Sequence, residues 1–503
     1  MGSANQAAGP GKSGSSGQVV AGHVFKSQTD TETIPHLIED FLGKGLDFKE
    51  ACRQAFLKLK GRNAFLALHA GTGELVAARK GSPLIVGVVG SGDEKEKEVF
   101  IASDVPAFLL RTNKVMYLDD GEMVSALHGV PRFYNTATGA EVKKRVVEIG
   151  WEAEQAEKGE YPHFMIKEIM EQKDTIARAI NQPDSEIEKV AGLIARAKEV
   201  FFVGCGTAAR VCHTAEYMFS GVAGKQVRSV PASEFWNYRH FLTKDALVVA
   251  ISQSGETADT MEALEVAKAA GAKIVSLVNV QGSSMTRLSD YVFMINAGPE
   301  KAVASTKATT AQMAIVLLLA YAVAGKLKEG KRLLVDIAAK VNDMLNPRYV
   351  ERIKELAERL RQKKNIFIIG RGFNYPMALE SAIKIMEVSY IHAQGFAGGE
   401  MKHGPIALIE RGSPVIVLTA NDPVKHETIS NAVELKARGA FIIGVGPENE
   451  KAFDYWIKTP EAGTAASPIV NIIPVQVLAY YLSIFIGNDP DFPKHLAKAV
   501  TVK

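Results

Sequence analysis

The chain has few cysteines, little excess charge and no long uninterrupted apolar run. Three cysteines in 503 residues cannot build a disulfide framework or a Cys-rich zinc cluster, and they favour a reducing compartment. A formal net charge of +3 predicts no general attraction to nucleic acid or to an anionic membrane. The longest apolar run, residues 313–324, is shorter than the roughly 20 residues that cross a bilayer. We therefore expect a cytoplasmic protein with neither a nucleic-acid nor a membrane partner.

The N-terminal third combines a low-complexity start with an α+β pattern. Residues 1–20 are rich in Gly, Ser and Ala, which predicts a flexible leader. A helical segment at 34–60, interrupted at Gly43–Gly45, then precedes several short β-like runs, so residues 21–150 are predicted to form an α+β domain. Residues 151–183 are charged and helix-permissive, and we expect a helical connector there.

Beyond residue 184 the sequence contains a duplicated α/β unit. Short, wholly apolar runs alternate with amphipathic helices, a pattern typical of parallel strands covered on both faces. EVFFVGCGT matches NIFIIGRGF with an offset of 166 between Gly204 and Gly370, and GAKIVSLVNV matches GAFIIGVGPE with an offset of 168 between Gly271 and Gly439. Similar offsets over a whole domain indicate duplication. The two copies are predicted to span residues 184–345 and 346–503.

The segment ISQSGETADT, at 251–260, predicts a phosphate-binding turn. It follows a buried strand and leads into a helix, whose start supplies free N–H groups and the positive end of a dipole. Ser252, Ser254 and Thr257 offer hydroxyls, and Gly255 permits close backbone approach. An ordinary Ser/Thr helix cap would look similar, but so many small donors together favour phosphate. The matching turn TANDP lacks them, so only the first copy is expected to bind phosphate.

The second copy carries a group of ionisable residues. Glu380, Lys384 and Glu387 are spaced to share one helix face, although a surface salt-bridge stripe has the same spacing. The glycine-rich segment QGFAGGEMKHGP, which includes His403, is dense in His, Lys and Glu and favours a functional site. One carboxylate can move a proton between adjacent carbons, and a histidine can open a sugar hemiacetal. No spacing of His, Cys, Asp and Glu predicts a zinc or iron site.

Taken in order, the motifs CGTA, SQSGETADT, VASTKA, ALESAIKIMEVSYIHA, GGEMKHGP and HLAKAVTVK closely resemble one family. It is the family of glucosamine-6-phosphate synthases, the glutamine:fructose-6-phosphate aminotransferases, and the similarity covers residues 22–503. The resemblance implies two tandem sugar isomerase (SIS) domains of flavodoxin-like α/β fold, after a glutamine amidotransferase type-2 domain. It further implies a cofactor-free homodimer that converts fructose 6-phosphate and ammonia into glucosamine 6-phosphate.

The resemblance also implies residue roles. Glu387 would move the proton between C1 and C2, His403 would open the ring, and Lys498 would form a Schiff base with the ketose, assisted by Lys384. From the sequence alone, Lys498 is more simply a solvated terminal lysine. The phosphate and sugar would be held by Cys205, Gly206, Thr207, Ser252, Gln253, Ser254, Thr257, Val303 and Ser305.

Two features depart from the family pattern. Ala208 stands where the family usually has Ser, which removes a hydroxyl beside the sugar. The similarity to the glutaminase domain begins only near its middle, at GHVFKSQTDTE, so Asp30 of the glutamine-binding segment is retained but no Cys follows Met1. Cys52 lies on an amphipathic helix and is predicted to be a core residue. We therefore expect the chain to use free ammonia or ammonia from a separate glutaminase chain, and the half-domain to expose apolar sheet.

Three alternatives stay open at this point. A stand-alone SIS deaminase or deglycase would run the same proton chemistry in reverse. A non-catalytic regulator would need the phosphate turn but has no use for Glu387, His403 and Lys498 together. Truncation of a full synthase and a naturally split gene fit the N-terminal half-domain equally well.

Overall fold

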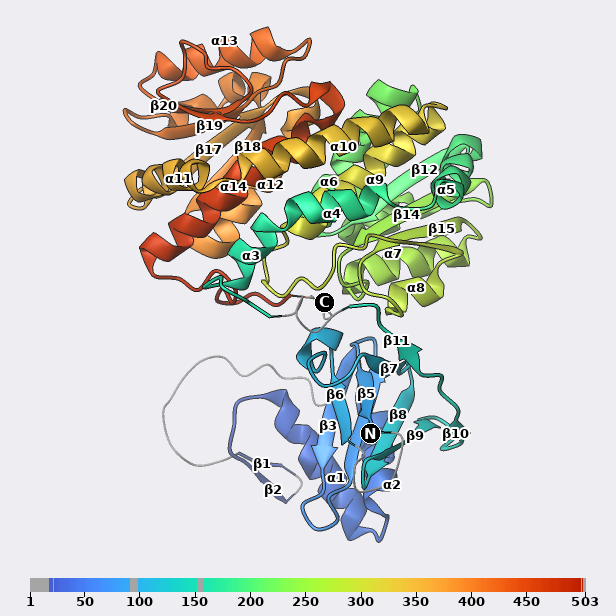
Figure 1. Ribbon diagram of the computed structural model, residues 1–503. Helices are drawn as coiled ribbons and strands as arrows, with labels where there is room; N and C mark the ends of the chain where they lie inside the picture. Colours follow the sequence, from blue (N-terminus) through green and yellow to red (C-terminus); the bar gives the residue numbers. More distant parts are fainter. Residues whose placement is uncertain (1–17, 21, 91–97, 152–156, 499, 501–503) are drawn as a thin grey trace. The chain divides into compact units, whose positions relative to one another are not determined.

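The computed structural model describes residues 18–20, 22–90, 98–151, 157–498 and 500 (Figure 1). The chain divides into two compact units, of which the smaller comprises Met1–Leu84, Val88–Ile101 and Leu118–Arg145 and the larger comprises the rest. Residues 1–17 of the expected leader lie outside the described residues. The next three form β1 (Gln18–Val20), which pairs with β2 (His23–Phe25), so regular structure begins before the predicted domain start at residue 21.

The smaller unit is an α+β structure, as predicted. The interrupted helix is confirmed as α1 (Thr33–Gly43) and α2 (Phe48–Lys58), separated by a turn in which Gly45 has a φ of +85°. An antiparallel sheet in the order β10-β9-β8-β4-β3 accompanies them. Its strands are β3 (Asn63–Leu68), β4 (Leu75–Lys80), β8 (Glu122–Leu127), β9 (Val130–Asn135) and β10 (Glu141–Val142).

The expected exposure of apolar sheet in this unit is seen along β3. Leu66 is 48% exposed and Leu68 is 68% exposed, whereas Phe65 between the helices and the sheet is buried. A second sheet, in the order β11-β7-β5-β6, is not confined to this unit, because β7 and β11 belong to the larger unit and β5 and β6 have residues in both. It consists of β5 (Ile85–Val89), β6 (Glu98–Ala102), β7 (Lys114–Tyr117) and β11 (Val147–Glu148).

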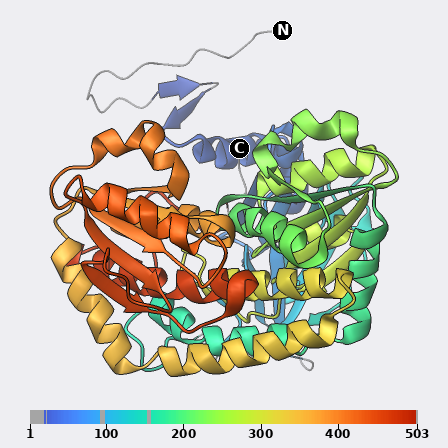
Figure 2. The same ribbon diagram turned by 90° about the horizontal axis from the view of Figure 1, so that it is seen from above.

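The larger unit contains the two predicted α/β repeats side by side (Figure 2). Both sheets are wholly parallel and have the strand order 2-1-3-4-5 of flavodoxin-like folds. The first sheet consists of β12 (Glu199–Gly204), β13 (Arg228–Pro231), β14 (Ala246–Ser252), β15 (Lys273–Val278) and β16 (Tyr291–Met294). The second consists of β17 (Asn365–Gly370), β18 (His392–Ala397), β19 (Pro414–Leu418), β20 (Phe441–Gly446) and β21 (Tyr455–Lys458).

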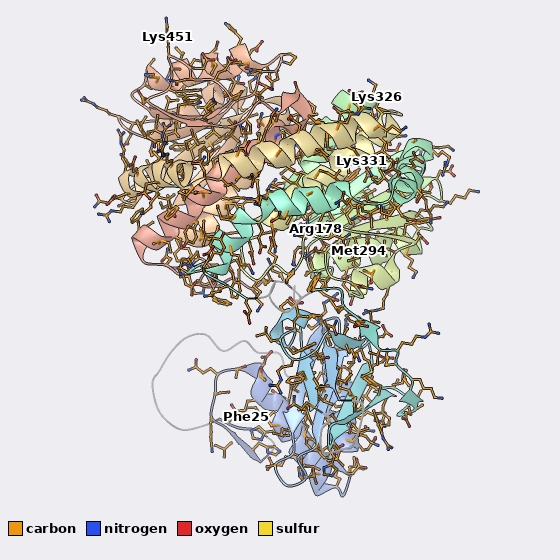
Figure 3. All side chains as sticks on the ribbon, in the orientation of Figure 1. Phe25, Arg178, Met294, Lys326, Lys331 and Lys451 are labelled. Carbon is orange, nitrogen blue, oxygen red and sulfur yellow. The ribbon has the colours of Figure 1, made fainter. Side chains whose placement is uncertain are left out.

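Helices cover both faces of each sheet. The connector is helical as expected, in α3 (Phe164–Met170) and α4 (Gln172–Ile180). Arg178 on α4 donates hydrogen bonds to the carbonyl groups of Asn296 and Ala297 in the first repeat (Figure 3). The repeats themselves contain α5 (Asp184–Arg196), α6 (Gly206–Met218), α7 (Ala258–Ala269), α8 (Ser284–Leu288), α9 (Lys307–Val323), α10 (Leu327–Met344), α11 (Pro347–Leu360), α12 (Tyr375–Ser389), α13 (Lys425–Lys436) and α14 (Gly463–Ile486).

Equivalent positions of the two repeats have nearly the same backbone φ angles. At the start of the first crossover, Gly206 and Gly372 both have a φ of +53°. At its end, Gly224 and Tyr390 both adopt the left-handed conformation, with φ of +59° and +60°. Each pair is separated by 166 residues, the offset that the strand motifs predict. The duplication therefore extends from sequence to individual dihedral angles.

The repeats share one apolar core, in which α9 and α14 are the most deeply buried helices. Within the described part of the chain, α14 is the one helix long and apolar enough to cross a membrane by length and composition. However, 78% of its most apolar stretch is buried inside the protein. Packing between the sheets thus accounts for its composition.

Candidate functional site

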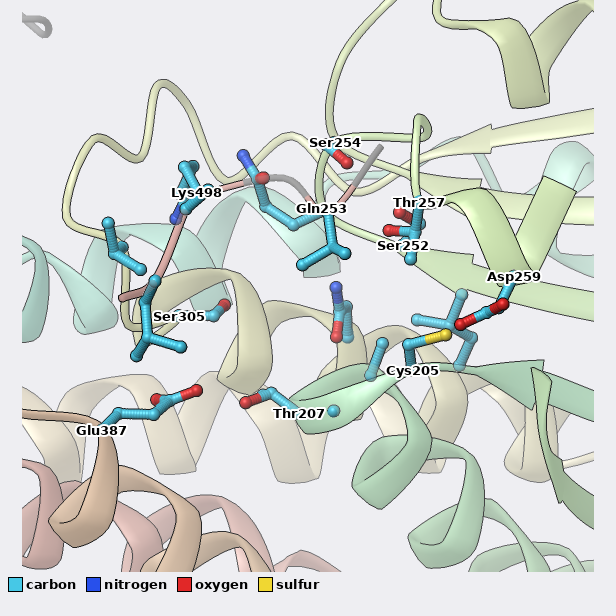
Figure 4. A pocket seen from close by; sticks show the side chains of 18 residues that line it. Cys205, Thr207, Ser252, Gln253, Ser254, Thr257, Asp259, Ser305, Glu387 and Lys498 are labelled. Atoms are coloured by element: carbon cyan, nitrogen blue, oxygen red, sulfur yellow. The ribbon is translucent and has the colours of Figure 1, made fainter. Parts of the chain in front are cut away.

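A cavity of about 320 Å³ opens at the carboxyl ends of the first-repeat strands (Figure 4). In an open α/β sheet this is the edge at which ligands bind. Three parts of the larger unit contribute to it: the first repeat, helix α12 of the second repeat, and the C-terminal segment. Among the lining residues are those predicted from the sequence: Cys205, Gly206, Thr207, Ser252, Gln253, Ser254, Thr257, Val303, Ser305, Glu387 and Lys498.

The turn after β14 presents hydroxyl groups to this cavity. The Ser252 hydroxyl oxygen accepts a hydrogen bond from the Gly255 N–H at 2.9 Å, which leaves its proton available to a ligand. Gly255 has a φ of +68°, and a Cβ atom there would lie 2.1 Å from the Ser283 hydroxyl oxygen. Only glycine fits this position without rearrangement. The turn is therefore shaped by its backbone as well as by its hydroxyls.

Helix α7 begins at the same turn and carries the positive end of its dipole there. Thr257 occupies the N-cap position, but its side chain makes no capping hydrogen bond. The first helical N–H, that of Ala258, donates to the carbonyl oxygen of Val500 at 3.0 Å. The C-terminal segment therefore lies against the start of α7, where an anion would be stabilised.

The same segment brings Lys498 over the cavity, where a buried carboxylate holds it. Its Nζ lies 2.7 Å from Glu300 Oε2 and donates a hydrogen bond of 2.7 Å to the carbonyl oxygen of Ala302. The other Glu300 oxygen accepts from the N–H groups of Thr306 and Ala308 at the start of α9. Burial alone would raise the pKa of Glu300, but Lys498 and these hydrogen bonds lower it below its ordinary value.

A second buried carboxylate, Glu168 on α3, lies beside Glu300. Its Oε1 accepts hydrogen bonds from the N–H groups of Lys301 and Ala302. Burial, reinforced by the charge of Glu300, raises the pKa of Glu168 to about 8. Sequence reasoning missed both carboxylates, because neither belongs to a motif with Lys498 and the three residues are far apart in the chain. The position of Glu300, three residues before the VASTKA motif, was the one available signal.

The ionisable face of α12 is buried, so it is not a surface salt-bridge stripe. Lys384 Nζ lies 2.6 Å from Glu387 Oε2 and 3.5 Å from Glu380 Oε1. Burial would lower the pKa of Lys384, but the two carboxylates together raise it. Burial raises the pKa of Glu380 to about 7. The Thr207 hydroxyl donates to Glu380 at 3.0 Å and so links α6 of the first repeat to α12 of the second.

The cavity therefore has two chemically different ends. Figure 4 shows Lys498 and Glu387 on one side and the hydroxyls of Ser252 and Thr257 on the other. At the start of α6, Thr207 lies between the two sides and Cys205 lies on the side of Ser252 and Thr257. An elongated ligand with an anionic group at one end would present its other end to a carboxylate and an amine.

Three of the predicted site residues lie elsewhere. Lys384 does not line the cavity but contacts it through Glu387. His403 is exposed at the end of the 3-10 helix Gly398–His403 and is not among the described residues that line the cavity. Asp30 begins the 3-10 helix Asp30–Glu32 in the smaller unit.

The three cysteines have distinct environments. Cys52 is fully buried on α2, as predicted, and burial raises the pKa of its thiol to about 12. Cys212 is fully buried on α6, and burial raises its pKa as well. Cys205 is half-buried and lines the cavity.

Comparisons with known proteins agree with this architecture. The SIS domain family model matches residues 193–322 and 359–486. The glutamine–fructose-6-phosphate aminotransferase of Thermococcus kodakarensis is 43% identical over 492 residues, covering 96% of this chain and 81% of the relative. Its counterpart in Methanothermobacter thermautotrophicus is 43% identical over 495 residues, covering 96% and 80%. The solved C-terminal domain of the Francisella tularensis aminotransferase matches with a TM-score of 0.63 and 33% identity, covering 67% of this chain and all of that domain.

The cysteine environments predict an order of thiol reactivity. In the native protein at pH 8, iodoacetamide should modify Cys205 first, because it lines the cavity whereas Cys52 and Cys212 are fully buried. Burial raises the pKa of the Cys205 thiol as well. A pKa raised from 9.0 to about 12 lowers the thiolate population of Cys52 roughly 1,000-fold. Peptide mass spectrometry after timed labelling measures the order. Early modification of Cys52 would contradict the described packing of α2.

Proposed function

The chain belongs to the family of isomerizing glutamine–fructose-6-phosphate aminotransferases, and on this basis we propose that its cavity binds fructose 6-phosphate and forms glucosamine 6-phosphate with ammonia. The observation that carries the proposal is the composition of the cavity. A turn suited to phosphate, a lysine and a carboxylate meet in one space of about 320 Å³, and this is the combination that a phosphorylated ketose needs for imine formation and proton transfer.

The phosphate is proposed to bind at the turn Ser252–Thr257. The hydroxyls of Ser254 and Thr257 line the cavity, and the α7 start contributes its dipole. A phosphate there would compete with the Val500 carbonyl oxygen for the Ala258 N–H. The matching turn of the second repeat, around Asn421, does not line this cavity, so one phosphate is expected per chain.

The reacting carbons are proposed to lie between Lys498 and Glu387. The Lys498 amine would attack the C2 carbonyl, forming the C=N bond of an imine while the carbonyl oxygen leaves as water. Ammonia would then replace the lysine at C2. Glu387 would remove the proton from C1 and return it at C2, and its ion pair with Lys384 would fix the carboxylate in place.

Glu300 is proposed to position Lys498 for this chemistry. The Lys498 side chain is 19% exposed and its charge is paired by a carboxylate that is itself fully buried. Loss of that partner would leave the lysine free to adopt other rotamers and would lower the fraction of molecules with the amine over the cavity. Glu300 thus acts through Lys498 and has no proposed contact with the sugar.

His403 and the oligomeric state are connected in this proposal. Because His403 lies outside the cavity of its own chain, its ring-opening role requires either movement of the segment Gly398–His403 or a second copy of the chain. The expected homodimer in the cytoplasm would supply that second copy.

The amino donor for the 503-residue chain by itself is proposed to be ammonia. A glutaminase of this type needs an activated thiolate. Cys52 and Cys212 are buried, and Cys205 lines the sugar cavity. The three thiols of the chain are therefore unsuited to that role, and ammonia would come from solution or from a separate glutaminase chain.

Replacing Ser254 by Ala should weaken fructose 6-phosphate binding. Loss of one hydrogen bond to a charged group costs about 1.5–3 kcal/mol, or about 10- to 150-fold in affinity. Isothermal titration calorimetry measures the change. Asn421→Ala, in the equivalent turn of the second repeat, is the matched control and should bind normally. Equal affinity of wild type and Ser254→Ala would place the phosphate elsewhere.

Replacing Glu387 by Gln should slow proton exchange at C1 and C2 by about 100-fold or more while changing ligand affinity little, since the shape is kept and the base is lost. NMR in deuterated water follows the exchange. Glu358→Gln, at an exposed position on α11, is the control. Exchange at the wild-type rate would remove Glu387 from the mechanism.

Borohydride reduction with fructose 6-phosphate should attach the sugar to Lys498, as detected by peptide mass spectrometry. In Glu300→Gln the label should stay on Lys498, but its yield should fall at least several-fold while the Kd for the sugar phosphate changes little. A purely structural role for Glu300 would instead lower affinity and thermal stability together. Labelling of another lysine would exclude Lys498 as the imine-forming residue.

Ammonium chloride at mildly alkaline pH should support glucosamine 6-phosphate formation by the purified chain, whereas glutamine should not. Product can be quantified by anion-exchange chromatography. Release of glutamate from glutamine by a Cys52→Ala variant, at the same rate as by the unmodified chain, would reveal a glutaminase site that does not depend on Cys52.

A further inference from the structure

Two histidines and a glutamate converge in the smaller unit, between strand β2 and helix α1. Glu39 Oε2 lies 3.3 Å from His23 Nδ1 and 3.5 Å from His36 Nδ1. All three ligand atoms lie within 4.8 Å of one another. His23 comes from β2, whereas His36 and Glu39 are one turn apart on α1. None of them takes part in the chemistry proposed for the larger unit.

From this geometry we propose that His23, His36 and Glu39 bind one Zn²⁺ ion, which ties β2 to α1. Zinc binds imidazole nitrogen and carboxylate oxygen at about 2.0–2.2 Å, and a tetrahedral angle then separates two ligand atoms by roughly 3.4 Å. The two distances to Glu39 match that separation. A small rotation of the imidazole rings would bring the third distance into range, and water would complete the coordination.

The outer nitrogen atoms of both histidines face carboxylates. His23 Nε2 lies 2.9 Å from Asp40 Oδ1. His36 Nε2 is shielded from solvent, has no hydrogen-bond partner and lies 3.8 Å from Glu32 Oε1. Carboxylates in these positions orient metal-binding histidines and fix their tautomer.

The surroundings of the cluster tie it to the local fold of β2 and α1. Glu32 accepts hydrogen bonds from the backbone N–H groups of Lys26 and Ser27, and so holds the turn between β2 and α1. Phe25 packs edge-on against the His36 ring, at a centroid distance of 4.8 Å, and is labelled in Figure 3. Glu39 is 70% exposed, so the ion would exchange with solvent.

The sequence analysis expects no residue spacing that suits zinc, yet Glu39 lies three residues after His36 on the same helix. His23 lies on a separate element and is brought into place only by the fold. Protonated histidines paired with the same carboxylates are the competing explanation, because such ion pairs need no metal.

Calorimetric titration of the EDTA-treated, dialysed full chain with ZnCl₂ at pH 7.5 tests the proposal. We expect one equivalent to bind, and Co²⁺ in place of Zn²⁺ to give the visible absorption of a four-coordinate site. His23→Ala and Glu39→Gln should each weaken zinc binding at least 10-fold. His426→Ala, at an exposed position on α13, is the matched control and should bind as the unmodified chain does.

Limited trypsin digestion provides a second measurement that does not depend on enzyme activity. Zinc should slow cleavage at Lys26 in the unmodified chain and have no effect in Glu39→Gln, whose exposed side chain can change without disturbing the core. Circular dichroism confirms that each variant is folded. Absence of stoichiometric binding, or equal binding by folded His23→Ala, would establish that the cluster consists only of ion pairs.

Discussion

The packing of α9 and α14 into one apolar core is the constraint on which the rest of the larger unit depends. Both helices are buried almost along their full length, and the core around them includes residues from both sheets. Because this core is shared, the two repeats are not independent domains. Because α12 packs against α14 on one side and against α6 on the other, the position of Glu387 relative to the first repeat is set by this core.

Buried charge is tolerated around the cavity because each ion has a partner. Removing an ion from water costs several kcal/mol, which a close partner and hydrogen bonds can offset. Glu300 has Lys498 and two N–H groups at the α9 start, and Lys384 has two carboxylates. Burial raises the pKa values of Glu168 and Glu380 to about 8 and 7. The carboxyl groups around the cavity therefore differ in how strongly their charged forms are stabilised.

Features that are local in the chain could be predicted from the sequence. The turn Ser252–Thr257 follows a buried strand and precedes a helix, and the two repeats share apolar strands at nearly constant offsets. The pairing of Glu300 with Lys498 could not be predicted, because 198 residues separate them and only the fold brings them together. Burial of Glu380 and Lys384 on α12 could not be predicted either. Helical periodicity shows that they share a face with Glu387, but it does not show which other elements cover that face. The cluster of His23 with Glu39 was missed because the two residues lie on separate elements, β2 and α1, which only the fold brings together.

The two repeats contribute different residues to one cavity. By the offset of 166 residues, the first-repeat counterpart of Glu387 is Gly221, where a Cβ atom would lie 2.7 Å from the ring of Phe373. An acidic side chain has no room there, while the turn TANDP of the second repeat lacks the small residues of Ser252–Thr257. Deleting either half, or making the two halves identical by recombination, would therefore remove one end of the cavity. Fusion in one chain also guarantees a one-to-one ratio of the two specialised halves, which two separate genes would have to maintain by regulation.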